Sequence, residues 1–267
     1  MDSSERRERR RVTGLVTAIV AAILVLWQFG PIDVSLWSRP SIAISRAAEL
    51  WVGVPGLPPL WQQIASTLGA TLGGLVVGVF AGFVCAVALA EFSYVRRVLT
   101  PFLAAINAVP RVAWVPVITL VFGFGIITKL VMSGAIVFLV VFFNVLDAAV
   151  HAPPVLIDGV RALGGDRLAL MRDVRAYSAI GAVVAALPNA IAFALVGVVF
   201  AESLSAESGL GALMFNAMHR GSAEDLIVSA VTLGLIGLAL TALATRAQTA
   251  VLRQLGSDGQ VASSRAR

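Results

Sequence analysis

Long stretches without charge constrain this chain more than any other feature of its sequence. A helix needs roughly 20 apolar residues to cross a hydrocarbon core of ~30 Å, and most of these stretches are long enough. They cover residues 12–29, 64–90, 131–146, 180–201 and 226–244. With 58% hydrophobic and only 13% charged residues, the chain also has too little charge to cover the surface of a soluble domain. We therefore predict an all-α integral membrane protein.

The first stretch could also belong to a secretory signal peptide, because the basic segment 6–11 precedes it. However, residues 13–29 exceed the ~7–15 residues of a signal-peptide core, and no small-x-small cleavage site follows them. We expect this stretch to be retained as a membrane helix.

A further span is expected between residues 98 and 124. Pro101, Pro110 and Pro116 interrupt it, so we expect it to be kinked and packed against other helices. With this span included, about six transmembrane helices are predicted, at residues 12–30, 64–90, 98–124, 127–147, 178–201 and 226–246.

The distribution of basic residues predicts how the spans are oriented. Four segments that share one side carry most of the arginines, whereas the other side has only Arg39, Arg46, Lys129 and Arg220. The positive-inside rule then places both termini in the cytoplasm, with the chain in the plasma membrane. This asymmetry also explains the net charge of +5 without a nucleic-acid partner. The predicted parts are a basic cytoplasmic tail at 1–11, a transmembrane domain at 12–253 and a polar cytoplasmic tail at 254–267.

The predicted cytoplasmic loop, residues 150–177, is too long and too patterned for a plain connector. Its proline pair at 153–154 can open a helix. Leu156, Val160 and Leu163 then fall on one narrow apolar face of that helix. The loop therefore begins with a short amphipathic helix.

Two glycines in the middle of the loop predict a hinge. Gly164 and Gly165 can end the first helix in a left-handed turn, and Asp166 can cap a second one. The second helix would carry Leu168 and Met171 on one face. Such a pair of amphipathic helices either lies on lipid headgroups or docks into a groove of a partner protein.

Three blocks of the sequence together resemble the permease subunits of binding-protein-dependent ABC importers. Asp-Gly-Val at 158–160, followed by Gly164, resembles the coupling motif of these permeases, in which Glu-Ala-Ala precedes a glycine. Residues 107–125 resemble a stretch of their third span, and residues 201–217 resemble their external segment after the fifth span. The blocks are most similar to the branch that imports sulfonates, taurine, nitrate and certain vitamin precursors, and the resemblance covers roughly residues 60–250.

The resemblance implies a permease subunit that forms the pathway for a small anionic solute, such as a sulfonate, taurine or nitrate, or for a vitamin precursor. It implies three partners: an ATP-binding-cassette ATPase subunit, an external solute-binding protein and a second permease. ATP would be bound by the ATPase subunit, and no cofactor is expected in this chain. The residues that it assigns to coupling with the ATPase are Leu156, Asp158, Gly159, Arg161, Gly164, Gly165 and Arg167.

The loop departs from the family motif at two places. Asp158 replaces the usual glutamate, and Ala176-Tyr177 stand where the family has Leu-Pro. The second permease could be another copy of this chain or an unlike subunit with the fuller motif. We favour the homodimer, because closed two-fold pairs are the commonest oligomers.

Arg111 is the most costly side chain in the predicted membrane region, since an arginine at the centre of a membrane helix costs roughly 3 kcal/mol. It is expected to face protein or water, where it either attracts an anion or supports the kinked span. Asn107 and Trp114 are predicted to line the pathway with it, and buried packing is the alternative. Glu202 resembles a family position and is expected to anchor the structure.

Several glycines repeat at a spacing of four residues in the second predicted span. Small residues at this spacing allow the backbone of another helix to approach closely. That helix could belong to the same subunit or to a second copy. The glycines are Gly69, Gly73, Gly74, Gly78 and Gly82.

No catalytic or metal-binding constellation is recognisable in the sequence. Cys85 is the only cysteine, and His151 and His219 fall on opposite predicted sides. The sole lysine, Lys129, follows Thr128 rather than a glycine, so the ATP-binding motif GxxxxGK[ST] does not occur. We therefore predict a transport subunit that is not an enzyme. A gradient-driven transporter is the alternative, although no carboxylate stands out at the centre of a predicted span.

Overall fold

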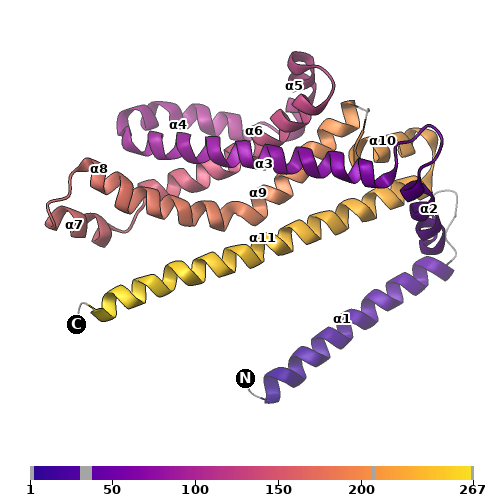
Figure 1. The fold of residues 1–267 in the computed structure, drawn as a ribbon, viewed down its shortest axis with the longest axis horizontal. Helices are drawn as coiled ribbons and strands as arrows, with labels where there is room; N and C mark the ends of the chain where they lie inside the picture. The colour runs from indigo at the N-terminus through magenta and orange to yellow at the C-terminus, as the bar shows by residue number, and fades with distance from the viewer. Residues whose placement is uncertain (1–2, 31–37, 206–207, 266–267) are drawn as a thin grey trace.

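The computed structural model describes residues 3–30, 38–205 and 208–265, and in these segments it contains helices and no strands. Figure 1 shows an elongated bundle in which α3, α6, α9 and α11 run along one another, with α2 across one end and α7 and α8 at the other. The helices are α1 (Ser3–Phe29), α2 (Pro40–Val52), α3 (Leu60–Glu91), α4 (Ser93–Ala108), α5 (Trp114–Phe122), α6 (Ile126–Val150), α7 (Pro154–Ala162), α8 (Arg167–Ala169), α9 (Ala176–Ser205), α10 (Leu210–Arg220) and α11 (Ala223–Arg265).

Four helices in the described part of the chain are long and apolar enough to cross a membrane. They are α3, α6, the continuous helix Leu170–Leu204 and the first 29 residues of α11. The pair α4 and α5 counts as a fifth, bent span, and the apolar part of α1, Gly14–Phe29, is shorter. The predicted all-α membrane fold is confirmed.

The third predicted span, expected to be kinked, is divided into two separate helices, α4 and α5. Its two halves meet at an angle of 87°. Val109 has an extended backbone (φ −68°, ψ 127°), as the ring of the following Pro110 favours, so α4 ends at Ala108. No residue of α4 is buried, whereas Val115 of α5 packs against Met132 of α6. The first half contributes a partly buried contact, Leu103, to the core formed by α3, α6 and α9, so the expected packing is looser for α4 than for α5.

The glycines of α3 face α6 of the same chain. A Cβ atom added at Gly74 would overlap Ser133, and one added at Gly78 would lie 2.6 Å from the carbonyl oxygen of Gly134. The absence of side chains thus allows α3 and α6 to pack closely along their length. Gly69 is different, because an added Cβ there would meet no atom within 4 Å. Four of the five glycines therefore form a contact within one subunit.

Two helices were not anticipated from the sequence, α2 and α10. Arg46 of α2 forms ion pairs with Asp225 of α11 (2.7 Å) and with Glu49 (2.8 Å), and these two carboxylates raise the pKa of Arg46. A left-handed residue, Gly221 (φ 67°), ends α10. Both helices lie at the end of the bundle that is opposite α7 (Figure 1).

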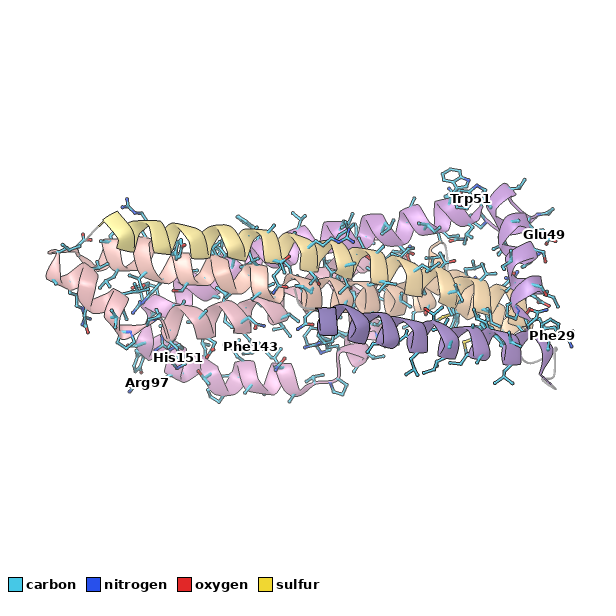
Figure 2. The ribbon with its side chains drawn as sticks, turned by 90° about the horizontal axis from the view of Figure 1, so that it is seen from below. Phe29, Glu49, Trp51, Arg97, Phe143 and His151 are labelled. Atoms are coloured by element: carbon cyan, nitrogen blue, oxygen red, sulfur yellow. The ribbon has the colours of Figure 1, made fainter. Side chains whose placement is uncertain are left out.

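Two further predictions concern the polar tails of the chain and the positions of its tryptophans. Helix α1 begins at Ser3 and α11 continues to Arg265, so both helices extend into the predicted polar tails. The sequence of residues 31–63 also predicts an interfacial belt of Trp37, Trp51 and Trp61, and the side chains of Trp51 and Trp61 are exposed in the structure. Trp37, which the same pattern includes, lies outside the described residues. Figure 2 shows Trp51, Glu49 and Phe29 at one end of the molecule, and Arg97 and His151 toward the other.

Gly78→Ala is expected to lower the melting temperature of the purified chain, because its methyl group would lie 2.7 Å from Val137 Cβ. Overpacking of this kind costs about 1–3 kcal/mol. Gly69→Ala is the matched control, since its methyl group enters open space. Thermal unfolding in detergent, followed by tryptophan fluorescence, provides the comparison. Equal melting temperatures for the two variants would contradict this account of the contact between α3 and α6.

Candidate functional site

The loop between α6 and α9 carries a short helix that projects from the end of the bundle (Figure 1). Pro154 occupies the first turn of α7, where its missing N–H is not needed. At the other end, Gly164 adopts φ 77°, and the N–H of Gly165 donates to the carbonyl oxygen of Val160 at 2.9 Å. The predicted first helix and its left-handed glycine turn are therefore confirmed.

The segment after the turn differs from the prediction. Asp166 caps it as expected, since its Oδ1 atom accepts a hydrogen bond from the N–H of Ala169 at 2.8 Å. However, α8 continues through a π-helical turn, Leu170–Arg175, directly into α9. The prediction of a separate second amphipathic helix is wrong. No proline or glycine stands between Arg167 and α9, so nothing in the local sequence ends the helix.

Apolar side chains of the first loop helix and its end are exposed to solvent in the single chain. The exposed fractions are 81% for Val155, 48% for Leu156 and 90% for Leu163. The predicted coupling residues Leu156, Asp158, Gly159, Arg161 and Gly164 are all exposed as well, and Gly165 is half-buried. The side chain of Arg167 lies outside those that the structure describes. The loop thus presents an unpartnered surface of apolar and charged groups.

One ion pair connects this loop to the membrane bundle. The guanidinium of Arg175, on the π-helical turn, contacts the carboxylate of Glu91 at the end of α3. Arg175 also donates to the carbonyl oxygen of Ala90 at 3.5 Å, and Arg96 donates to the same oxygen at 3.0 Å. Cations at the carboxyl end of a helix are stabilised by its free carbonyl groups. The last turn of α3 is therefore the attachment point of the loop.

The bend between α4 and α5 carries the three residues predicted to line a pathway. Arg111 begins a 3₁₀ turn there, and its guanidinium lies 4.3 Å from the centre of the Phe193 ring of α9. Asn107 is exposed on the last turn of α4, and Trp114 is half-buried at the start of α5. Arg111 is itself half-buried, with protein on one side. A cation over an aromatic face is stabilised by about 0.5–2 kcal/mol.

A buried ion pair lies at the opposite end of the bundle. Lys129 Nζ of α6 lies 3.3 Å from Glu202 Oε1 of α9, and both residues are almost completely buried. The hydroxyl of Thr67 donates to the same carboxylate at 2.9 Å, and Lys129 donates to Ser66 Oγ at 3.0 Å. A buried ion pair is tolerated only when such additional hydrogen bonds satisfy it. We call these residues the polar cluster: Gln63, Ser66, Thr67, Lys129 and Glu202.

The polar cluster also holds the start of α10. Glu202 accepts a hydrogen bond from the N–H of Gly211 at 3.0 Å, and Thr67 Oγ1 accepts one from the N–H of Leu210 at 2.9 Å. The side chain of Gln63 accepts one from the N–H of Gly209. These are backbone donors that a helix start leaves unpaired. An added Cβ at Gly209 would collide with the carboxylate of Glu202, so only glycine fits.

The sequence predicted the anchoring role of Glu202 but missed its partner. Lys129 was expected at the external end of the predicted span 127–147 with no partner assigned, whereas the structure buries it in the first turn of α6 beside Glu202. The sequence feature that could have indicated this ion pair is a lone lysine at the edge of an apolar stretch. An ionisable residue in that position requires an opposite charge from another span.

A bundle of apolar helices with a satisfied polar cluster at one end and an exposed amphipathic helix at the other is typical of a multi-pass membrane protein. Similarity to known proteins identifies the family of membrane proteins to which the chain belongs. Residues 74–256 match the family described as "Binding-protein-dependent transport system inner membrane component". This match covers more than half of the chain, and the chain therefore belongs to that family. The resemblance drawn from three short blocks of sequence is confirmed.

Named relatives agree with this assignment. The chain is 32% identical over 227 residues to the riboflavin transport system permease protein of Chloroflexus aurantiacus, with 83% of each chain covered. It is 25% identical to the taurine transport system permease protein of Escherichia coli, over 87% of this chain and 84% of that protein. It is 22% identical to the nitrate import permease protein of Leptolyngbya laminosa, over 90% and 93% of the two chains.

The fold is similar to that of a solved transporter. The inward-facing MetNI methionine ABC transporter matches with a TM-score of 0.55 and 19% identity, over 72% of this chain and 94% of the other. At this identity the likeness concerns the fold alone. The chain is thus a permease subunit of the ABC importer family, whose members work with an ATPase and a substrate-binding protein.

Glu202→Ala is expected to lower the yield and thermal stability of the folded chain strongly, because it leaves Lys129 buried without a partner. Breaking one side of a buried pair costs roughly 3–5 kcal/mol. The double variant Lys129→Met with Glu202→Leu should regain part of that loss. Asp147→Asn is the control, since the Asp147–His151 pair is about three-quarters exposed and such pairs contribute little. Gel-filtration profiles and melting temperatures in detergent measure all of these effects, and a double variant as unstable as Glu202→Ala would count against the pairing.

Proposed function

We propose that α7 and the turn that follows it dock this permease onto its ATPase subunit, so that ATP hydrolysis drives import of a solute through the bundle. The observation that carries the proposal is the exposure of Leu156, Val155 and Leu163 at the end of the membrane bundle that is opposite the polar cluster. An amphipathic helix with apolar residues at this spacing fits a groove on a partner protein. Asp158 and Arg161, also exposed, add charged contacts around the apolar face.

Leu156→Asp is expected to weaken attachment of the ATPase at least about tenfold, because a charge would enter the apolar face of α7. Leu156→Met is the matched control and should keep attachment. The Gly164→Trp variant should also fail to bind the ATPase. The backbone angle φ of 77° at this position is strained for any residue with a side chain, so the turn that ends α7 would be distorted. Co-purification of the ATPase and ATP hydrolysis by the complex are measured against the amount of inserted chain. Wild-type attachment and transport in both Leu156→Asp and Gly164→Trp would refute the role of the loop.

We further propose that this end of the bundle is cytoplasmic and that two copies of the chain form the transport unit. In Figure 1 the C-terminal end of α11 lies on the same side of the molecule as α7 and α8, and the N-terminal end of α1 points toward that side. A common side for both termini and the loop supports the orientation that the arginines predict. Recovery of one tagged copy with a second, differently tagged copy from an ATP-hydrolysing complex tests the pairing, and a complex that never contains both tags would contradict it.

For the solute, we propose a small anion that passes the bend between α4 and α5. Arg111 supplies a positive charge there that is stabilised by the Phe193 ring, and no ion pair joins it to a carboxylate among the described residues. The taurine and nitrate permeases among the relatives support this solute class. A vitamin precursor is the second candidate, because the relative of highest identity named above is a riboflavin permease. In either case Asn107 and Trp114 flank Arg111 on the pathway.

Arg111→Ala is expected to lower anion transport about tenfold, as for loss of one charge-assisted contact, without lowering the amount of folded complex. Arg111→Lys should retain part of the transport. Phe193→Leu is the discriminating variant, because it removes the ring and keeps the cation. Uptake of labelled taurine or nitrate into proteoliposomes that contain the complete transporter is the measurement. If Arg111→Ala and Phe193→Leu both lower the amount of folded complex, and transport falls only in proportion to it, the role of Arg111 is packing.

A further inference from the structure

A polar cavity lies between the loop and the end of α3. Its volume is about 490 Å³, and its charged lining residues are Glu91, Arg96, Arg161, Asp166 and Arg175. It therefore joins the last turn of α3, the first turn of α4 and both sides of the glycine turn. The proposed function involves Arg161 only as a charged contact beside the apolar face of α7, and it assigns no ligand to this cavity.

The two carboxylates that line this cavity have partners of their own, so arginine N–H donors remain available to bind a ligand. Glu91 is engaged by Arg175, and Asp166 is engaged by the N–H of Ala169. Arg96 uses one donor on a carbonyl oxygen. In the described part of the chain, no hydrogen bond or ion pair engages the guanidinium of Arg161. A guanidinium has five N–H donors arranged to bind phosphate oxygens, so the cavity is suited to a phosphate group.

A separate apolar groove lies farther along α3 and α9. It has a volume of about 430 Å³ and lies between α3 and α9. Phe80 and Phe83 line it from α3, and Ile180, Val183 and Leu187 line it from α9. Its lining is almost free of polar atoms, as suits an acyl chain rather than a soluble ligand.

The two cavities are aligned on α3. Glu91 follows Phe80 by eleven residues, which is about three turns, so both lie on one face of the helix. Phe83 and Glu91 are separated by about 12 Å along the axis, within the reach of one lipid molecule. Beside the polar cavity, the aromatic side chains of Phe92 and Tyr94 are 58% and 78% exposed, as is typical at a membrane–water interface.

We propose that the polar cavity and the groove form one binding site for an anionic phospholipid. The phosphate binds Arg161 and Arg96, and one acyl chain lies in the groove between α3 and α9. Basic pockets at the cytoplasmic ends of membrane helices recognise lipid headgroups by this chemistry. Because the cavity is bounded by α3 on one side and by the loop on the other, a bound phosphate braces the loop against the bundle.

The headgroup is tested with the full chain, purified in detergent, delipidated and titrated with dioleoyl phosphatidylglycerol. Native mass spectrometry counts the bound lipids. One lipid should bind tightly to the wild-type chain. Arg161→Gln should lower the affinity for this lipid at least about tenfold, because charge-assisted hydrogen bonds to the phosphate are lost. Arg161 is exposed, so this substitution does not disturb folding. Arg97→Gln is the matched control, because Arg97 lies on the same helix as Arg96 and does not line the cavity.

The groove is tested with Val183→Trp, which fills it, and with Leu238→Trp on the exposed side of α11 as control. Val183→Trp should weaken binding of the lipid and leave binding of glycerol 3-phosphate unchanged. Arg161→Gln should weaken binding of both ligands. Wild-type lipid binding in Arg161→Gln, or no saturable binding at all, would overturn the proposal. Glycerol 3-phosphate that binds as tightly as the lipid would assign the cavity to a soluble phosphate. Loss of self-association in Val183→Trp, without loss of lipid, would assign the groove to a second copy.

Discussion

The buried ion pair between Lys129 and Glu202 is the interaction on which the arrangement of this bundle depends. Desolvation of two charges costs several kcal/mol per ion, and only a precise set of partners offsets that cost. Here the partners come from the starts of α3, α6 and α10 and from the end of α9. Four helix ends are therefore held in one geometry by a single cluster, which also supplies the free N–H groups of α10 with acceptors.

Helix α3 connects this cluster to the opposite end of the molecule. Its first turns supply Gln63 and Thr67, its middle packs on α6 through glycines, and its last turn holds the loop through Glu91. The helix is 32 residues long, or about 48 Å, and has no internal proline. The loop proposed to receive the ATPase is thus attached to the same rigid helix that carries part of the polar cluster.

Local rules predicted much of this architecture from the sequence. Apolar length located the spans, Pro110 located the break after α4, and Gly164 and Asp166 located the turn and cap in the loop. Each of these features depends on the backbone preferences of neighbouring residues. The second loop helix was predicted wrongly, because the chain passes through a π-helical turn without any breaking residue. Helices α2 and α10 were missed, because each is held mainly by contacts with other helices.

The sequence by itself determined the class of the protein, since the thickness of a bilayer translates directly into a length of apolar helix. It also determined the family, through three blocks of residues that need no coordinates to recognise. Only the tertiary structure decided which groups meet. Lys129 and Glu202 are 73 positions apart, Arg175 and Glu91 are 84 apart, and the ring beneath Arg111 belongs to α9. The pairing of helices depends on how their faces pack in three dimensions, and the spacing of residues along one chain does not specify it.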